Sequence, residues 1–142
     1  KEDFGFLNVV SLTQNKIPLK YTTSGTVLEV QLNEPIKSGE SAIFEMRFEG
    51  QVPPVIRRAG KNSQEGVALS MAQWYPKMAE YDFEGWHADP YIGREFHGVW
   101  GDFDVKLTLD KKYTVGGKGY LHNRNEIADG YGSKEAKEVA DL

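Results

Sequence analysis

Thr26-Val27-Leu28-Glu29-Val30-Gln31-Leu32 is the stretch that decides the fold class. Its apolar side chains recur at every second position, at Leu28, Val30 and Leu32, with polar side chains between them. A period of two is that of a β-strand with one buried and one solvated face. Asn33-Glu34-Pro35 ends the stretch, because proline donates no hydrogen bond to a sheet. The sequence therefore predicts a strand over 26–32.

The same alternation recurs on both sides of this stretch. After a turn at Lys37-Ser38-Gly39-Glu40, a second alternating run covers 42–48, and we expect it to pair antiparallel with 26–32 across a shared buried face. A third run covers 102–109 and ends in a turn at Asp110-Lys111-Lys112. Weaker strand candidates are 6–12, 19–22 and 66–71. Short strands joined by turns predict an all-β fold.

Composition limits the classes of function. The 142 residues fit one domain, which we place at 1–122, followed by an irregular or frayed tail over 123–142. With 17 Lys and Arg against 21 Asp and Glu, the net charge of −4 argues against a nucleic-acid surface. The absence of cysteine excludes disulfides and thiolate metal sites. No apolar run approaches the roughly 18 residues of a membrane span.

Aromatic residues concentrate between Gln73 and Phe103. Nine of the chain's seventeen aromatic residues fall there: Trp74, Tyr75, Tyr81, Phe83, Trp86, Tyr91, Phe96, Trp100 and Phe103. Three interpretations stay open. The segment is a loop held by its own aromatic packing, or a sugar-binding platform of tryptophans, or a surface buried against another domain.

Metal and nucleophile motifs are weak in the same segment. His87-Ala88-Asp89 and Glu95-Phe96-His97 hold imidazoles and carboxylates that are able to bind zinc, but their spacing matches no zinc signature, and His122 is the one further histidine. A calcium site is also weakly indicated. Its candidate ligands do not form a dense acidic loop: Asp82, Asp89, Asp102 and Asp104. No Gly-x-Ser-x-Gly elbow is present. The sequence therefore predicts no metal and no catalytic residue in this chain.

The run from Met71 to Asp82 carries a family resemblance, together with Gly85-Trp86-His87, Gly93-Arg94-Glu95-Phe96 and the segment 101–109. It resembles the N-terminal all-β domain of the zinc aminopeptidase family (aminopeptidase N and leukotriene hydrolase), in its bacterial, Bacteroidetes-like members. The resemblance covers about residues 20–122. It implies twisted, mostly antiparallel sheets in a saddle-like or sandwich-like domain.

The resemblance also implies that this chain is non-catalytic. The family's His-Glu-x-x-His zinc helix and its Gly-x-Met-Glu-Asn strand are absent from this sequence. We therefore expect a non-catalytic domain that packs on the zinc-bearing catalytic domain of its parent chain and lines the cleft for a peptide substrate. By position, Gln73 is the residue that lends an amide to that cleft. The residues expected at the interface or in the aromatic loop are Trp74, Tyr75, Trp86, Tyr91, Phe96 and Trp100.

Two further expectations complete the interpretation. The resemblance implies an extracytoplasmic parent, either periplasmic or membrane-associated. The alternative function is a free-standing β-sandwich that binds carbohydrate through Trp74, Trp86 and Trp100, because flat indole rings stack on pyranose faces.

Overall fold

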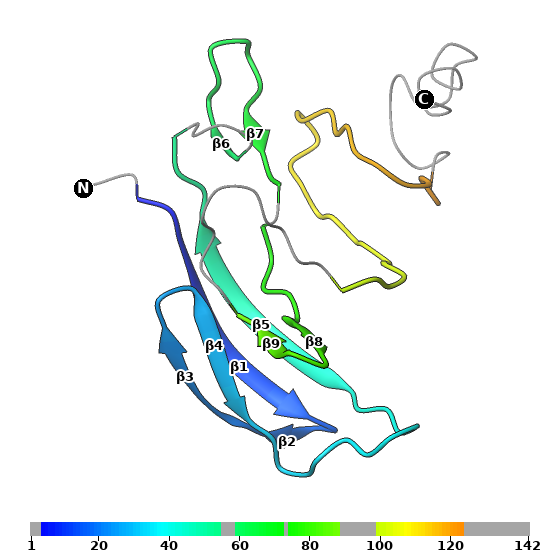
Figure 1. The fold of residues 1–142 in the computed structure, drawn as a ribbon. Coiled ribbons are helices and arrows are strands. Elements are labelled where there is room, and N and C mark those ends of the chain that lie inside the picture. The colour runs from blue at the N-terminus through cyan, green and yellow to red at the C-terminus, as the bar shows by residue number, and fades with distance from the viewer. Residues whose placement is uncertain (1–3, 55–58, 73, 89–98, 124–142) are drawn as a thin grey trace. The chain divides into compact units, whose positions relative to one another are not determined.

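The computed structural model describes residues 4–54, 59–72, 74–88 and 99–123. These residues form strands, turns and loops, with no helix among them, so the predicted all-β class is confirmed (Figure 1). The chain divides into two compact units, Lys1–Gly101 and Asp102–Leu142. Within the described ranges, no helix has the length and apolar character needed to cross a membrane.

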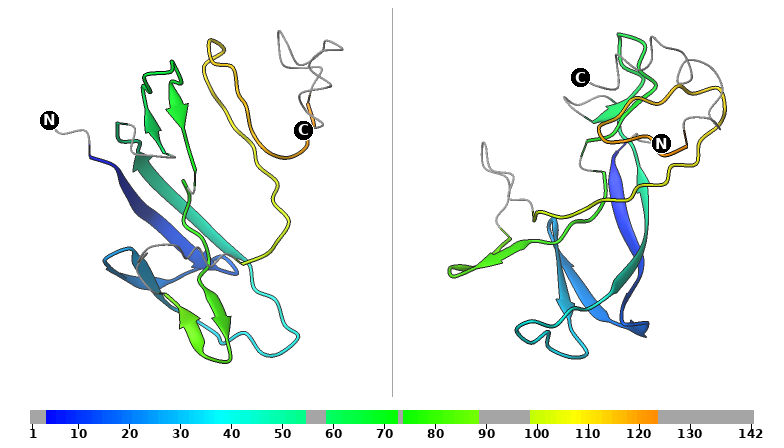
Figure 2. Two further views of the ribbon diagram at one scale, coloured as in Figure 1. Left: turned by 45° about the horizontal axis from the view of Figure 1, so that its top comes forward. Right: turned by 90° about the vertical axis from the view of Figure 1, so that its right-hand side faces the viewer.

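The longest strands of the first unit lie side by side in a three-stranded sheet. β1 (Phe6–Gln14) pairs antiparallel with β5 (Phe44–Gln51) along its whole length, and β2 (Ile17–Pro18) pairs with the end of β1 (Figure 2). A bulge between Val9 and Ser11 shifts the register by one residue. The sheet order is thus β2-β1-β5.

A tight turn sets the end of this sheet. Asn15 and Lys16 connect β1 to β2, and both have positive φ, at 51° and 70°. Two positive φ values define the type I′ turn, whose twist matches that of a hairpin. Asn15 also extends the β1–β5 pairing, because its N–H donates to Ile43 O at 2.8 Å and its Oδ1 accepts from Ile43 N–H at 3.0 Å.

A separate hairpin contains the strand that was predicted first. β3 (Lys20–Ser24) pairs antiparallel with β4 (Val27–Gln31) through the two-residue turn Gly25-Thr26. Gly25, at φ 60°, takes the first central position, where a type II′ turn requires positive φ.

The predicted pairing of 26–32 with 42–48 is wrong. The two segments do form β4 and β5, but β4 pairs with β3 and β5 pairs with β1. The two-residue turn brings β3 against β4 at little loop cost, whereas the link from β4 to β5 is much longer and contains Pro35. The predicted turn inside that link is confirmed: Glu40 N–H donates to Lys37 O at 3.0 Å, with Gly39 at φ 80°.

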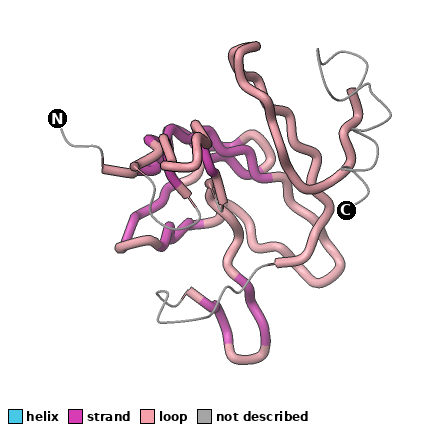
Figure 3. The backbone as a smooth tube through the Cα atoms, turned by 90° about the horizontal axis from the view of Figure 1, so that it is seen from above, coloured by secondary structure: helices cyan, strands magenta, loops and turns pink. Residues whose placement is uncertain are grey.

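Two short hairpins follow in the chain. β6 (Gly60–Lys61) pairs with β7 (Leu69–Ser70), and β8 (Glu80–Asp82) pairs with β9 (Gly85–His87). Figure 3 shows these strands as brief interruptions in long loops. The weaker strand candidates at 6–12 and 19–22 overlap β1 and β3, whereas only Leu69–Ser70 of the candidate 66–71 forms a strand, β7.

The second unit departs from prediction. Residues 102–109 form no strand, although their apolar residues alternate. Alternating apolar residues give a strand one apolar face, but a strand also needs a neighbouring strand to accept and donate its backbone hydrogen bonds. The described residues 102–123 pair with no such strand. The predicted turn after them is confirmed, because Asp110 O accepts from Tyr113 N–H and Asp110 Oδ1 accepts from Lys112 N–H, both at 3.1 Å. Apart from Asn123, the predicted tail lies outside the described residues.

The buried core is small. Among the described residues, the buried hydrophobic side chains are Leu12 and Leu19, at 5% and 8% exposed. The two residues are neighbours in the backbone, because Leu19 N–H donates to Leu12 O at 3.0 Å just after the end of β2.

One polar side chain is buried beside them. Gln14, at 3% exposed, ends β1 and holds the loop that follows β4. Its Oε1 accepts from Asn33 N–H at 2.9 Å and more weakly from Glu34 N–H at 3.4 Å, and its Nε2 donates to Glu34 O at 2.9 Å. The Gln14 side chain thus ties the segment after β4 to the end of β1.

Candidate functional site

The residues predicted for the cleft and the aromatic loop fall into two groups. Gln73, Tyr91 and Phe96 lie outside the described residues. The other four lie within the described residues and differ in their surroundings: Trp74, Tyr75, Trp86 and Trp100.

Trp74 is 38% exposed, and its ring contacts two other aromatic rings. Its centroid lies 6.4 Å from that of Phe48 on β5 and 5.9 Å from that of Tyr75, in tilted and edge-on arrangements. Aromatic pairs favour such geometries at these separations. Trp74 therefore attaches the segment after β7 to Phe48 of β5, and Tyr75 packs on Trp74.

The other two tryptophans are open to solvent. Trp86 on β9 lies opposite Tyr81 on β8, with centroids 4.9 Å apart, and the two residues are 62% and 66% exposed. Trp100 is almost fully exposed. The ring contacts thus place Trp74 against Phe48 of β5 and Trp86 against Tyr81 of β8.

The polar side chains that come together lie on the β8–β9 hairpin. Its register pairs Glu80 with His87 and Tyr81 with Trp86, which sends the charged and the aromatic side chains to opposite faces. The connecting turn, Asp82-Phe83-Glu84-Gly85, has an aspartate first and a glycine last, as type I turns favour. Gly85 has a φ of 105°, a conformation that L side chains rarely adopt.

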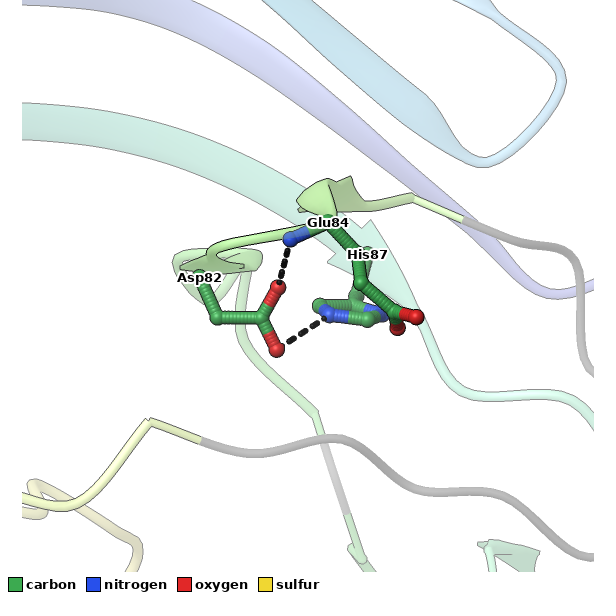
Figure 4. A network of polar contacts seen from close by, with 3 residues as sticks. All are labelled: Asp82, Glu84 and His87. Atoms are coloured by element: carbon green, nitrogen blue, oxygen red, sulfur yellow. Dashed lines mark hydrogen bonds and ion pairs between the residues drawn. The ribbon is translucent and has the colours of Figure 1, made fainter.

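Asp82 organises this turn with both of its carboxylate oxygens. Oδ1 accepts from Glu84 N–H at 2.8 Å, and Oδ2 lies 2.9 Å from His87 Nε2 (Figure 4). The Asp82 and His87 side chains are 35% and 17% exposed. One carboxylate therefore closes the turn and joins it to the far strand.

The acidic surroundings change the protonation of His87. The contact with Asp82 raises the pKa of the imidazole above its ordinary 6.5, and partial desolvation opposes this rise. The charges of Asp82, Glu80 and Glu84 also raise the His87 pKa. The site thus favours imidazolium at neutral pH more than a solvated histidine does.

The same three side chains invite comparison with a metal centre. Ligand-type atoms of Asp82, Glu84 and His87 all lie within 4.8 Å of one another. However, Asp82 already uses one oxygen on the Glu84 amide and the other on the imidazole. The arrangement is therefore best described as an ion pair within a hairpin, and the expectation of no zinc stays a prediction.

The sequence groups His87 with Asp89, Glu95 and His97, three residues that lie outside the described part of the chain. The partner that the structure gives to His87 is Asp82. The signal for this pair was present in the sequence. Asp-x-x-Gly marks a tight turn, and a tight turn between two short strands brings the flanking side chains of one face together.

Two hollows elsewhere on the surface are lined by few titratable side chains. One of about 300 Å³ is lined by Pro18, Lys20, Gln31, Leu32 and Asn33, beside the open ends of β3 and β4. Another of about 340 Å³ is lined by residues 62–65, between β6 and β7. Neither lining set contains a histidine or a pair of carboxylates, so neither is a candidate for acid–base catalysis.

Comparison with protein-family models, with curated proteins and with solved structures found no match to this chain. The resemblance to zinc aminopeptidases therefore stays a prediction that rests on sequence motifs. The described geometry contributes one polar hairpin and a set of incompletely covered apolar side chains.

Proposed function

We propose that this chain is a non-catalytic β domain of a zinc metallopeptidase of the aminopeptidase kind. In this proposal it packs on a catalytic domain elsewhere in the parent protein and lines the substrate cleft. The observation that supports it most is the incomplete burial of the apolar side chains in the first unit.

The strands carry apolar faces that their own unit covers only in part. Phe44, Met46 and Phe48 alternate along β5 and are half-buried, and only Leu12 and Leu19 are buried hydrophobics among the described residues. Burying one such side chain fully contributes about 1.5–3 kcal/mol. A domain that covered this surface would supply stabilisation that the described part of the chain lacks.

The aromatic segment after β7 is the part that we assign to the cleft. Trp74 packs on Phe48, which anchors this segment to β5 immediately after Gln73 in the sequence. In the proposal the Gln73 amide accepts from the ammonium of a peptide substrate and donates to its carbonyl. The zinc ion belongs to the parent's catalytic domain, since this sequence has no His-Glu-x-x-His helix. An extracytoplasmic location of the parent is part of the same proposal.

The test begins with the complete reading frame, inspected for His-Glu-x-x-His. The full-length protein and the isolated chain are then compared by acrylamide quenching of tryptophan fluorescence. We expect Trp74 and its neighbours to be less accessible in the full-length protein, because the catalytic domain covers them. Equal quenching in the two proteins, or a reading frame without the zinc motif, refutes the proposal.

A carbohydrate-binding module is the second candidate, and the exposed Tyr81–Trp86 pair is the observation that favours it. The rings are inclined by 58°, so a pyranose stacks on one ring rather than across both. Titration with a panel of oligosaccharides, read by tryptophan fluorescence, tests it. This candidate predicts a saturable change in tryptophan fluorescence that is abolished in Trp86→Ala and retained in Trp74→Phe. If no sugar changes the fluorescence, the candidate is refuted.

A further inference from the structure

The β8–β9 hairpin combines a short ladder with a closing contact that depends on charge. Each strand has three residues, joined through three residue pairs. Two-stranded hairpins are marginally stable in water even when they are longer. Contacts that close such a hairpin therefore decide how much of the time it is formed.

We propose that Asp82 and His87 form a protonation-dependent clasp, which holds the β8–β9 hairpin closed in mildly acidic solution and loosens it as the solution becomes alkaline. The closed hairpin fixes the exposed Tyr81–Trp86 pair on its opposite face. The clasp is thus a switch for the presentation of an aromatic surface, whichever partner that surface meets.

The geometry lets the single Asp82 carboxylate hold both the turn and the end of β9. Asp82 Oδ1 holds the turn through Glu84 N–H, while Oδ2 reaches across to His87 Nε2 at the end of β9. The contact is an ion pair when His87 is protonated, and two opposite charges 2.9 Å apart attract one another more strongly where they are partly shielded from water, as here, than in bulk water. When His87 loses its proton, its Nε2 is able to donate only as a neutral group, and the charge that binds it to Asp82 is gone.

The charges that act on the imidazole all favour the closed state. In the part of the chain that the structure describes, they belong to Glu80 directly across the ladder, Asp82, and Glu84 in the turn. Each is a carboxylate, and each is on the hairpin itself. An imidazolium at position 87 is attracted by all three, whereas a neutral imidazole leaves them to repel one another.

The sign of the pH dependence follows. Because the folded hairpin raises the pKa of His87 above 6.5, the stabilisation is complete below the unfolded value. It is lost as the pH rises through the higher pKa of the closed state. We therefore expect closure in the acidic range and loosening above neutrality.

Nuclear magnetic resonance of the whole chain tests the clasp between about pH 5 and about pH 9, the range in which a histidine titrates. The readouts are the His87 imidazole resonances and the cross-strand contacts between the Tyr81 and Trp86 rings. In the unmodified chain we expect both readouts to change with one midpoint, which lies above 6.5. In Asp82→Asn we expect the His87 midpoint to fall, while Glu49→Gln on β5 serves as a matched loss of one negative charge away from the hairpin.

His87→Gln is the second variant, because it keeps a polar side chain and removes the titration. We expect its Tyr81–Trp86 contacts to be constant over the same range of pH. The proposal is overturned if these contacts keep their pH dependence in His87→Gln. It is overturned equally if Asp82→Asn lowers the His87 midpoint no more than Glu49→Gln does.

Discussion

Replacing Gln14 by alanine tests the claim that one buried amide holds the exit of the β3–β4 hairpin. The change removes two hydrogen bonds of 2.9 Å, from Asn33 N–H and to Glu34 O, along with a weaker one of 3.4 Å. Each of the two short bonds contributes about 1 kcal/mol. Gln14 is 3% exposed, and the loss of its second methylene adds about 0.8 kcal/mol. Since Asn33 and Glu34 are themselves exposed, water satisfies the freed groups, and the total stays at about 2–3 kcal/mol.

Urea unfolding, followed by far-ultraviolet circular dichroism, measures this loss. With a slope of about 1–3 kcal/mol/M, the midpoint for Gln14→Ala is expected to fall by roughly 0.7–3 M. Amide exchange of Asn33 N–H should accelerate in the same variant, because its acceptor is gone. Gln51→Ala is the matched control: Gln51 Nε2 also donates to a backbone oxygen, Phe4 O at 2.6 Å, but the residue is exposed. Its loss should stay within about 0.5 kcal/mol. Equal losses in the two variants would refute the reasoning.

Three other predictions follow from particular residues. Gly39→Ala should destabilise the chain by about 1 kcal/mol in the same urea assay, because Gly39 has a φ of 80° in its turn; Gly116→Ala, at a position without positive φ, should change stability by a few tenths. The purified chain should bind no stoichiometric zinc, and elemental analysis that finds one zinc per chain, lost in His87→Ala or His97→Ala, contradicts this expectation. In a full-length parent, Gln73→Ala should lower kcat/KM for an unblocked peptide roughly ten- to a hundred-fold, the effect of one lost hydrogen bond of about 1.5–3 kcal/mol to a charged group; an equal effect on the N-acetylated peptide would mean that Gln73 does not contact the amino terminus.

Local patterns predicted the strands better than they predicted the pairing. Strict alternation located β4 and β5, and the Gly39 turn followed from glycine's tolerance of positive φ. The partner of each strand is a property of loop closure and of distant segments, which alternation does not encode. For the same reason 102–109 has the pattern of a strand and forms no ladder among the described residues.

The candidate site was predictable only in part. Metal-ligand residue types single out His87 but group it with the downstream residues Asp89, Glu95 and His97. The actual partner, Asp82, lies upstream across a tight turn. Gly85 marks that turn, and a turn between two short strands brings residues 82 and 87 onto one face of the hairpin.

The pairing of β1 with β5 has a consequence for the order of folding. At the Asn15 end, the bond to Ile43 closes a separation of 28 residues, while at the other end the bond from Gln51 to Phe4 closes one of 47. Loop-closure entropy makes the longer separation costlier by about 0.5 kcal/mol if each forms first. The hairpins β1–β2 and β3–β4, being local, are expected to form earlier than either. The long ladder then grows from the Asn15 turn toward Phe6, so that the type I′ turn acts as the starting point for the slowest step in building the sheet.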